Sequence, residues 1–196
     1  WIGDNILGQQ KTILYGGVII MFGHLSLAIP NINSFYIGLI LVVLGTGLLK
    51  PNISAIVGEL YENNPEMRQS GFTIFYMAIN LGSILGFFIC GYLGENIGWH
   101  YGFGAAGIGM AFGLIQYMYN IKLLEKLGAE PFNEINSDTK GKYKKIILIS
   151  IGLIFLITIS GLIGLWNINP VPLASILTLI ITLISLFYFF YIIVFG

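Results

Sequence analysis

Charge is what this sequence has least of: only 9% of its 196 residues are Asp, Glu, Lys or Arg. Hydrophobic residues make up 56%, and the mean hydropathy of +0.86 lies outside the range of soluble domains. The nine basic and nine acidic residues cancel, which leaves no net charge to attract nucleic acid. This composition predicts an integral membrane protein.

Cysteine is also nearly absent. Cys90 is the only one, which excludes an internal disulfide and most cysteine metal sites. The sequence has no paired histidines, no metal-ligand spacing and no nucleophile beside a base, so it predicts no catalytic residue, metal or cofactor. It also has neither an initiating methionine nor a signal peptide, and it stops within an apolar run. We therefore expect a segment of a longer protein.

Long apolar runs are what the sequence has in abundance. A helix needs about 20 apolar residues to cross roughly 30 Å of hydrocarbon. Six runs are long enough: 12–30, 35–59, 71–94, 100–121, 146–166 and 173–195. They are continuous rather than alternating, which argues against the strands of a membrane barrel. The sequence predicts an all-α integral membrane protein with about six transmembrane helices.

Most basic residues lie in the connections that would all face the same side of the membrane if each apolar run crosses it once. They are Lys11, Arg68, Lys122, Lys126, Lys140, Lys142, Lys144 and Lys145. The positive-inside rule then puts these connections, and both ends of the chain, in the cytoplasm. We expect three parts: membrane helices at 1–121, a cytoplasmic linker at 122–145 and a further hairpin at 146–196. The first part is rich in glycine, including the close-packing patterns Gly82-x-x-x-Gly86, Gly98-x-x-x-Gly102 and Gly109-x-x-x-Gly113.

Lys50 is the one basic residue that lies neither in a connection nor at the end of a run. It is roughly 13 Å from Glu59 along a helix, a depth at which a lysine costs at least about 2.5 kcal/mol. It either snorkels to the interface or faces a water-filled pathway, where it can bind an anionic group. Pro51 frees a backbone carbonyl and predicts a kink, with Asn52 as a nearby polar residue of the same cavity.

Asn80 reaches a comparable depth on the next run, with Tyr76 one turn away. An asparagine at this depth either joins two helices by hydrogen bonds or contributes to a polar patch that recognises substrate. The sequence alone leaves both interpretations open.

The first twelve residues, WIGDNILGQQKT, form a predicted cytoplasmic link. Gly8 permits a tight turn, and Asp4 can cap a helix or face the positive end of its dipole. Lys11 follows at the start of the first apolar run.

Three stretches carry a family resemblance: GTGLLKPNISAIVGELY, GFTIFYMAINLGSILG and GWHYGFGAAGIGM. Together they resemble the proton-dependent oligopeptide transporters of the major facilitator superfamily. The initial GDNILGQQKT is similar to the link between helices 2 and 3 of that superfamily. The resemblance implies a partial bundle, helices 3 to 6, followed by the extra hairpin of bacterial members.

The resemblance also implies roles for single residues. Lys50 matches a helix 4 lysine tied to proton coupling and peptide recognition, and Asn80 matches a helix 5 asparagine that contacts the peptide. We expect Asp4, Gly8, Lys11 and Pro51 to serve the conformational change, and Tyr76 and Asn52 to line the cavity. The stretch ENNPEMRQSG departs from the usual acidic and arginine-rich loop after helix 4. The Glu-x-x-Glu-Arg motif of helix 1 is absent from this segment.

The function expected is therefore a segment of a proton-coupled di- and tripeptide symporter in a bacterial cell membrane. Its partners are peptides, protons, lipid and the remaining helices of the same transporter, and its energy source is the proton gradient rather than a cofactor. Two alternatives stay open. One is a relative that carries another small anionic solute, and the other is a self-contained six-helix scaffold or accessory protein.

Overall fold

The computed structural model describes residues 1–133, 137–164 and 170–195, and every regular element among them is a helix. Residues 134–136 of the predicted linker lie outside the described residues, as do 165–169, which take in the end of the apolar run 146–166 and the start of the connection after it. So do the side chains of Lys140 and Lys144. The all-α prediction is confirmed for the part of the chain that is described.

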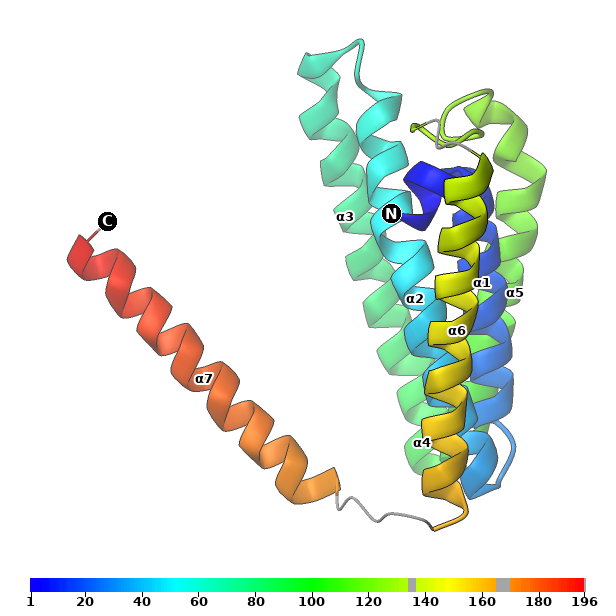
Figure 1. Ribbon diagram of the computed structural model, residues 1–196, viewed down its shortest axis with the longest axis vertical. Helices are drawn as coiled ribbons and strands as arrows, with labels where there is room; N and C mark the ends of the chain where they lie inside the picture. The colour runs from blue at the N-terminus through cyan, green and yellow to red at the C-terminus, as the bar shows by residue number, and fades with distance from the viewer. Residues whose placement is uncertain (134–136, 165–169, 196) are drawn as a thin grey trace. The chain divides into compact units, whose positions relative to one another are not determined.

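A π-helical turn, η1 (Gly3–Leu7), comes first, followed by α1 (Gln9–Leu27) and α2 (Ile32–Leu60). Then α3 (Pro65–Gly86), the π-helical turn η2 (Phe87–Gly91) and α4 (Tyr92–Asn96) follow one another as a single rod, and α5 (Trp99–Asn120) comes next. The short 3₁₀ helix η3 (Ile121–Leu124) precedes α6 (Ser137–Leu162) and α7 (Pro170–Phe195). Each of the six predicted runs thus falls on a helix (Figure 1).

Local signals at the helix ends explain most of these boundaries. The Asn31 side chain accepts a 2.8 Å hydrogen bond from the Asn33 amide and caps α2. Pro65 begins α3 and Pro170 begins α7, where the missing N–H of proline costs nothing. Helix α6 begins at Ser137, nine residues before the predicted apolar run, so its first turns are polar.

Three described helical segments are long and apolar enough to cross a membrane by length and composition alone: Ile32–Leu60, Pro65–Asn96 and Gly141–Gly161. Thr178–Ile192 is a shorter apolar stretch of α7. Helices α1 and α5 are not among them, and the first turn of α1, with Gln9, Gln10, Lys11 and Thr12, is polar. The helices are where the sequence predicts them, and three of the described segments have the length and hydropathy of a membrane span.

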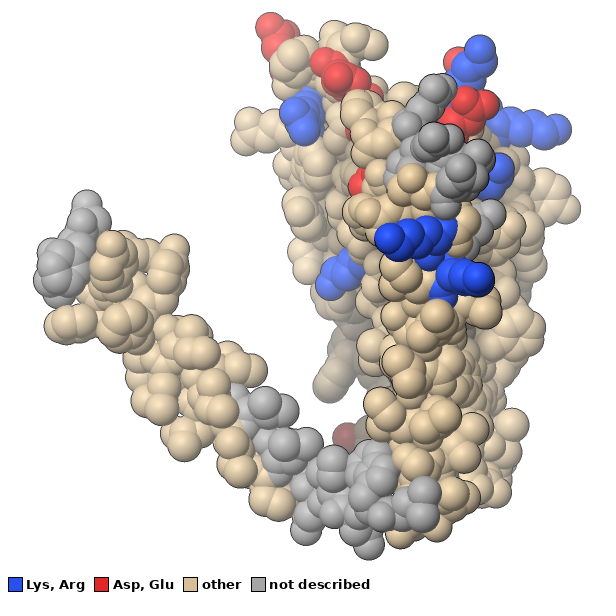
Figure 2. Space-filling view, in the orientation of Figure 1, with Lys and Arg blue, Asp and Glu red and all other residues tan. Residues whose placement is uncertain are grey.

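The chain divides into two compact units, Trp1–Ile146 and Ile147–Gly196. In the first, α1 makes its most extensive contacts with α2 and then with α5. The connection between α2 and α3 and the segment after α5 lie at the same end as the beginning of α1 (Figure 1). Acidic and basic side chains gather mostly at that end, as Figure 2 shows. We call it the polar end.

Glycines bring α1 and α2 into close contact at two points. A Cβ on Gly45 would lie 2.6 Å from the Gly16 carbonyl oxygen, and one on Gly23 would lie 3.0 Å from that of Gly38. Gly16 and Gly23 are seven residues apart on α1, and Gly38 and Gly45 are seven apart on α2. The two contacts therefore lie on one face of each of the two antiparallel helices. Of the glycines singled out in the sequence, Gly102 approaches the Cys90 carbonyl, whereas Gly82, Gly86, Gly109 and Gly113 meet no described atom within 4 Å.

Candidate functional site

Lys50 lies on the face of α2 that points away from α1. The residues of α2 that are buried are Gly38, Gly45, Asn52 and Ile56, and Lys50 precedes Asn52 by two positions, about 200° around the helix. Its side chain is exposed and makes no hydrogen bond or ion pair with any described residue. This lysine is therefore available to a ligand or to a part of the protein beyond this segment.

Pro51 does not end the helix, because α2 continues for nine residues beyond it. Neither polar neighbour reaches the carbonyl of Gly47 that proline leaves without its donor. Asn52 Nδ2 donates to the Leu48 carbonyl at 2.7 Å, and Ser54 Oγ donates to the Lys50 carbonyl at 3.2 Å. A Cβ on Gly47 would meet nothing within 4 Å, so no other described part of the chain packs against α2 at this position.

Asn52, which the sequence places beside Lys50, is packed against the first residues of the chain. It is only 7% exposed, and a Cβ on Gly3 would collide with its Oδ1 atom. The side chain thus packs under η1 and joins the first twelve residues, the link, to α2. A larger residue at position 3 would force the Asn52 amide to move.

Asn80 and Tyr76 are both exposed on α3. The Tyr76 ring stacks against Phe72 with 6.2 Å between ring centroids and also contacts Phe75. No hydrogen bond joins Asn80 to Lys50 or to another described side chain. The structure therefore places the predicted substrate residues on uncovered faces of two neighbouring helices, without a direct contact between them.

The link is the part of the predicted site that other residues hold by hydrogen bonds. Gly8 has φ +82°, a conformation that favours glycine, and separates η1 from α1, which confirms the predicted tight turn. Its carbonyl accepts hydrogen bonds from the Thr12 amide at 3.1 Å and from Thr12 Oγ1 at 2.7 Å. Lys11 remains exposed, while Thr12 is fully buried.

A second segment is hydrogen-bonded to the link, and the sequence did not predict this contact. We call residues 125–133, which follow η3, the strap. Gln10 donates from its backbone to the Gly128 carbonyl at 2.9 Å and from Nε2 to the Leu127 carbonyl at 2.7 Å. Asn133 donates from its backbone to the Asp4 carbonyl at 2.9 Å and from Nδ2 to Asn5 Oδ1 at 3.1 Å. The strap thus contacts both ends of the link.

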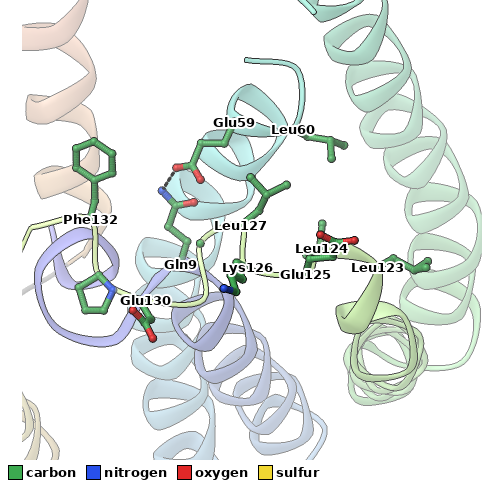
Figure 3. A pocket seen from close by; sticks show the side chains of 12 residues that line it. Gln9, Glu59, Leu60, Leu123, Leu124, Glu125, Lys126, Leu127, Glu130 and Phe132 are labelled. Carbon is green, nitrogen blue, oxygen red and sulfur yellow. Dashed lines mark hydrogen bonds between the residues drawn. The ribbon is translucent and has the colours of Figure 1, made fainter. Parts of the chain in front are cut away.

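A cavity of about 660 Å³ opens beside the strap at the polar end (Figure 3). Gln9, Glu59 and Leu60 line one part of it, and η3 and the strap line the rest. Gln9 Nε2 donates to Glu59 Oε1 at 2.7 Å, drawn as a dashed line in Figure 3. Gln9 Oε1 is buried and has no hydrogen-bond partner among the described residues. The sequence analysis assigned no role to Glu59.

A second cavity, of about 620 Å³, is lined mainly by apolar side chains of α2 and α5, with Ile13 of α1 and Phe75 of α3. The polar residues on its wall, Gln116, Tyr117 and Asn120, all belong to the last turns of α5. Tyr117 also donates to the Gln10 carbonyl at 3.1 Å, so α5 supports the link from the side. In the part of the chain that the structure describes, no group of three His, Cys, Asp or Glu residues could hold a metal.

Comparison with known proteins gives consistent matches. A sequence model described as "POT family" matches residues 10–137. The chain is 43% identical to the uncharacterized transporter YclF of Bacillus subtilis over 94% of this chain and 37% of the relative. It is 38% identical to a di-/tripeptide transporter of Lactococcus lactis subsp. lactis over 87% of this chain and 34% of the relative.

A solved structure of a peptide transporter also resembles this chain in its fold. A crystal structure of the peptide transporter POT in complex with sulfate superposes with a TM-score of 0.77 at 34% identity. The match covers 97% of this chain and 39% of that protein. The chain therefore spans a little over a third of the length of the proteins it matches, and the fold continues beyond the family model's last residue, through α6 and α7.

Proposed function

Since the chain belongs to the POT family of transporters, we propose that it is a segment of a bacterial proton-coupled symporter that imports di- and tripeptides. The observation that carries the proposal is the 38% identity with a protein named as a di-/tripeptide transporter, over 87% of this chain. The whole transporter alternates between states open to either side, and the substrate binds near the midplane between its two halves.

Lys50 is the residue on which the proposed substrate site depends. It is a charged group on an apolar helix, exposed in this segment and without a partner among the described residues. In the whole protein it binds the peptide carboxylate or exchanges between that carboxylate and an acidic residue of a helix outside this segment. Asn80, on the uncovered face of α3, hydrogen-bonds the peptide backbone.

The experiment that tests the proposal is uptake of a labelled dipeptide by the full-length protein in liposomes, with an inward proton gradient. We expect gradient-driven uptake by the parent protein and its loss in Lys50→Ala, with both proteins inserted to the same extent. Lys145→Ala is the matched control, because Lys145 is exposed in the polar first turns of α6 and has no role in the proposed site. Wild-type uptake rates in Lys50→Ala would contradict the role of this lysine.

A competition series separates peptides from other anionic solutes. We expect unlabelled di- and tripeptides to inhibit uptake of the labelled dipeptide, and small non-peptide anions to leave it unchanged. Stronger inhibition by a non-peptide anion would make the protein a family relative with a different substrate.

A further inference from the structure

The strap, more than a hundred residues later in the chain, hydrogen-bonds the amino end of α1. The Gln10 side chain reaches across 117 residues of sequence to Leu127, and its backbone amide binds the neighbouring Gly128 carbonyl. The first amides of a helix have no partners within it, and carbonyl oxygens are the groups that satisfy them. The strap supplies one such oxygen, that of Gly128, to the Gln10 amide, so the strap crosses α1 at its first turn.

The fit between link and strap is steric as well as polar. A Cβ on Gly8 would lie 2.6 Å from the Ala129 carbonyl oxygen, and a Cβ on Gly128 would lie 3.0 Å from the Gln9 Cβ. Both glycines have positive φ angles, +82° and +62°. The two segments therefore approach each other at backbone distance, which leaves no room for water between them at these points.

Burial shows what separating the two segments would require. Asn5, Gln9, Gln10 and Thr12 are each at most 9% exposed. If the strap lifted away, Gln10 would lose three backbone acceptors, the carbonyls of Glu125, Leu127 and Gly128, and Asn5 would lose its contact with Asn133. Leaving several buried polar groups unpaired is unfavourable, which argues against a strap that opens in every transport cycle.

We propose that the strap is a permanent brace: it stays on the link throughout the transport cycle, with Gln10 and Asn133 as positioning residues. The brace fixes the link relative to α2 and α5, so that the link moves with this helix bundle as one body. Tyr117 adds to it from α5, and Asn52 adds to it from α2. The part of the proposal that concerns transport rates depends on the proposed peptide uptake, whereas the permanence of the contact does not.

Hydrogen exchange of the full-length protein tests permanence without any transport assay. The backbone amides of Gln10 and Asn133 are both hydrogen-bonded across the interface between link and strap. We expect peptides that contain them to exchange slowly, to the same extent with and without a dipeptide present. Complete exchange within seconds, or a large difference between the two conditions, would overturn the brace.

Cross-linking tests whether transport needs the contact to open. In a background without other cysteines, Cys90→Ala included, Asn5→Cys and Asn133→Cys are joined by a bifunctional thiol reagent of roughly 5 Å reach, matched to two side chains in hydrogen-bond contact. We expect the cross-link to form and dipeptide uptake to stay near that of the untreated variant. Uptake lost on cross-linking and restored on cleavage of the reagent would overturn the proposal, as would failure of the cross-link to form.

The two single-cysteine variants, treated in the same way, control for modification of either position. If the untreated double variant and the parent protein take up no dipeptide, the proposed function fails, and the brace is then decided by hydrogen exchange alone. The two proposals therefore fail through different measurements.

Gln10→Glu tests the positioning role, because it keeps the size of the side chain and replaces the amide donor with an anion facing two carbonyl oxygens. We expect the maximal uptake rate per folded molecule to fall at least about fivefold, with KM changed by less than about twofold. Gln69→Glu makes the same chemical change at an exposed position and should leave both values unchanged. A Gln10→Glu protein with parental rates, or with a raised KM and an unchanged maximal rate, would contradict the assignment.

Discussion

Gln9 and Glu59 are joined by a hydrogen bond of 2.7 Å across 50 residues of sequence, from Nε2 of the amide to Oε1 of the carboxylate. The bond connects the first turn of α1 to the last turn of α2. Gln9 is 6% exposed, so its amide has little access to water as an alternative partner. A neutral donor thus holds a carboxylate at the point where the link, α2 and the strap meet.

Gln9→Glu should destabilise the full-length protein, because it sets two carboxylates within hydrogen-bond distance in a largely buried place. We expect a loss of about 1–3 kcal/mol in the free energy of unfolding, measured as a lower thermal midpoint in detergent. The exchange variant, Gln9→Glu with Glu59→Gln, restores one donor and one acceptor and should recover most of the loss. If the single and the exchange variants were equally unstable, the hydrogen bond would not be the cause.

Thr12→Val removes a hydroxyl donor and keeps the shape of the side chain. Thr12 is 0% exposed and donates to the Gly8 carbonyl at 2.7 Å, so we expect a loss of about 1 kcal/mol in unfolding free energy. Thr73→Val is the matched control, since Thr73 makes the same bond to the fourth preceding carbonyl, Gln69, at 2.9 Å but on an exposed face. Its change should be close to zero, and equal changes in both variants would contradict the importance of burial.

Gly45→Ala should force α1 and α2 apart. The added methyl group would lie 2.6 Å from the Gly16 carbonyl oxygen and 2.7 Å from Ile20 Cγ1, and overpacking of this kind costs about 1–3 kcal/mol. Gly47→Ala, two positions along the same helix, meets nothing within 4 Å. That variant should be as stable as the parent or slightly more so, because alanine favours a helix. Thermal midpoints of the two variants decide the point.

Asn80→Ala should weaken substrate binding if the proposed function holds. Loss of one hydrogen bond to the peptide predicts a KM for dipeptide uptake that rises about fivefold to tenfold. Ser83→Ala lies on the same helix, and Ser83 Oγ donates only to the Ile79 carbonyl of its own helix, at 2.9 Å. It should leave KM unchanged. An unchanged KM in Asn80→Ala would favour the interpretation of this residue as a contact between helices.

The apolar runs were sufficient to predict where the helices lie, and Gly8 marks the turn before α1. They were insufficient for the strap, because the bonds of Gln10 and Asn133 join residues more than a hundred positions apart. No local pattern encodes such a contact. The burial of Asn52 beneath η1 was not predictable for the same reason.

The close contact between α1 and α2 has a sequence signature in the spacing of its glycines. Gly16 and Gly23 are seven apart, as are Gly38 and Gly45, whereas the glycines singled out were four apart. Seven residues are two helical turns, so either spacing keeps glycines on one face. Which pairs meet depends on how the helices dock, and an isolated sequence does not contain that information.

The place of the strap in the chain also sets an order of events during synthesis. Gln10 leaves the ribosome long before Leu127, whose carbonyl its side chain binds 117 residues later. At about 5–20 residues per second, the delay is on the order of ten seconds. Throughout that time the amino end of α1 must bind water or the insertion machinery, although its apolar part is already available to the membrane. The first helix to emerge from this segment is thus among the last to acquire its final partners.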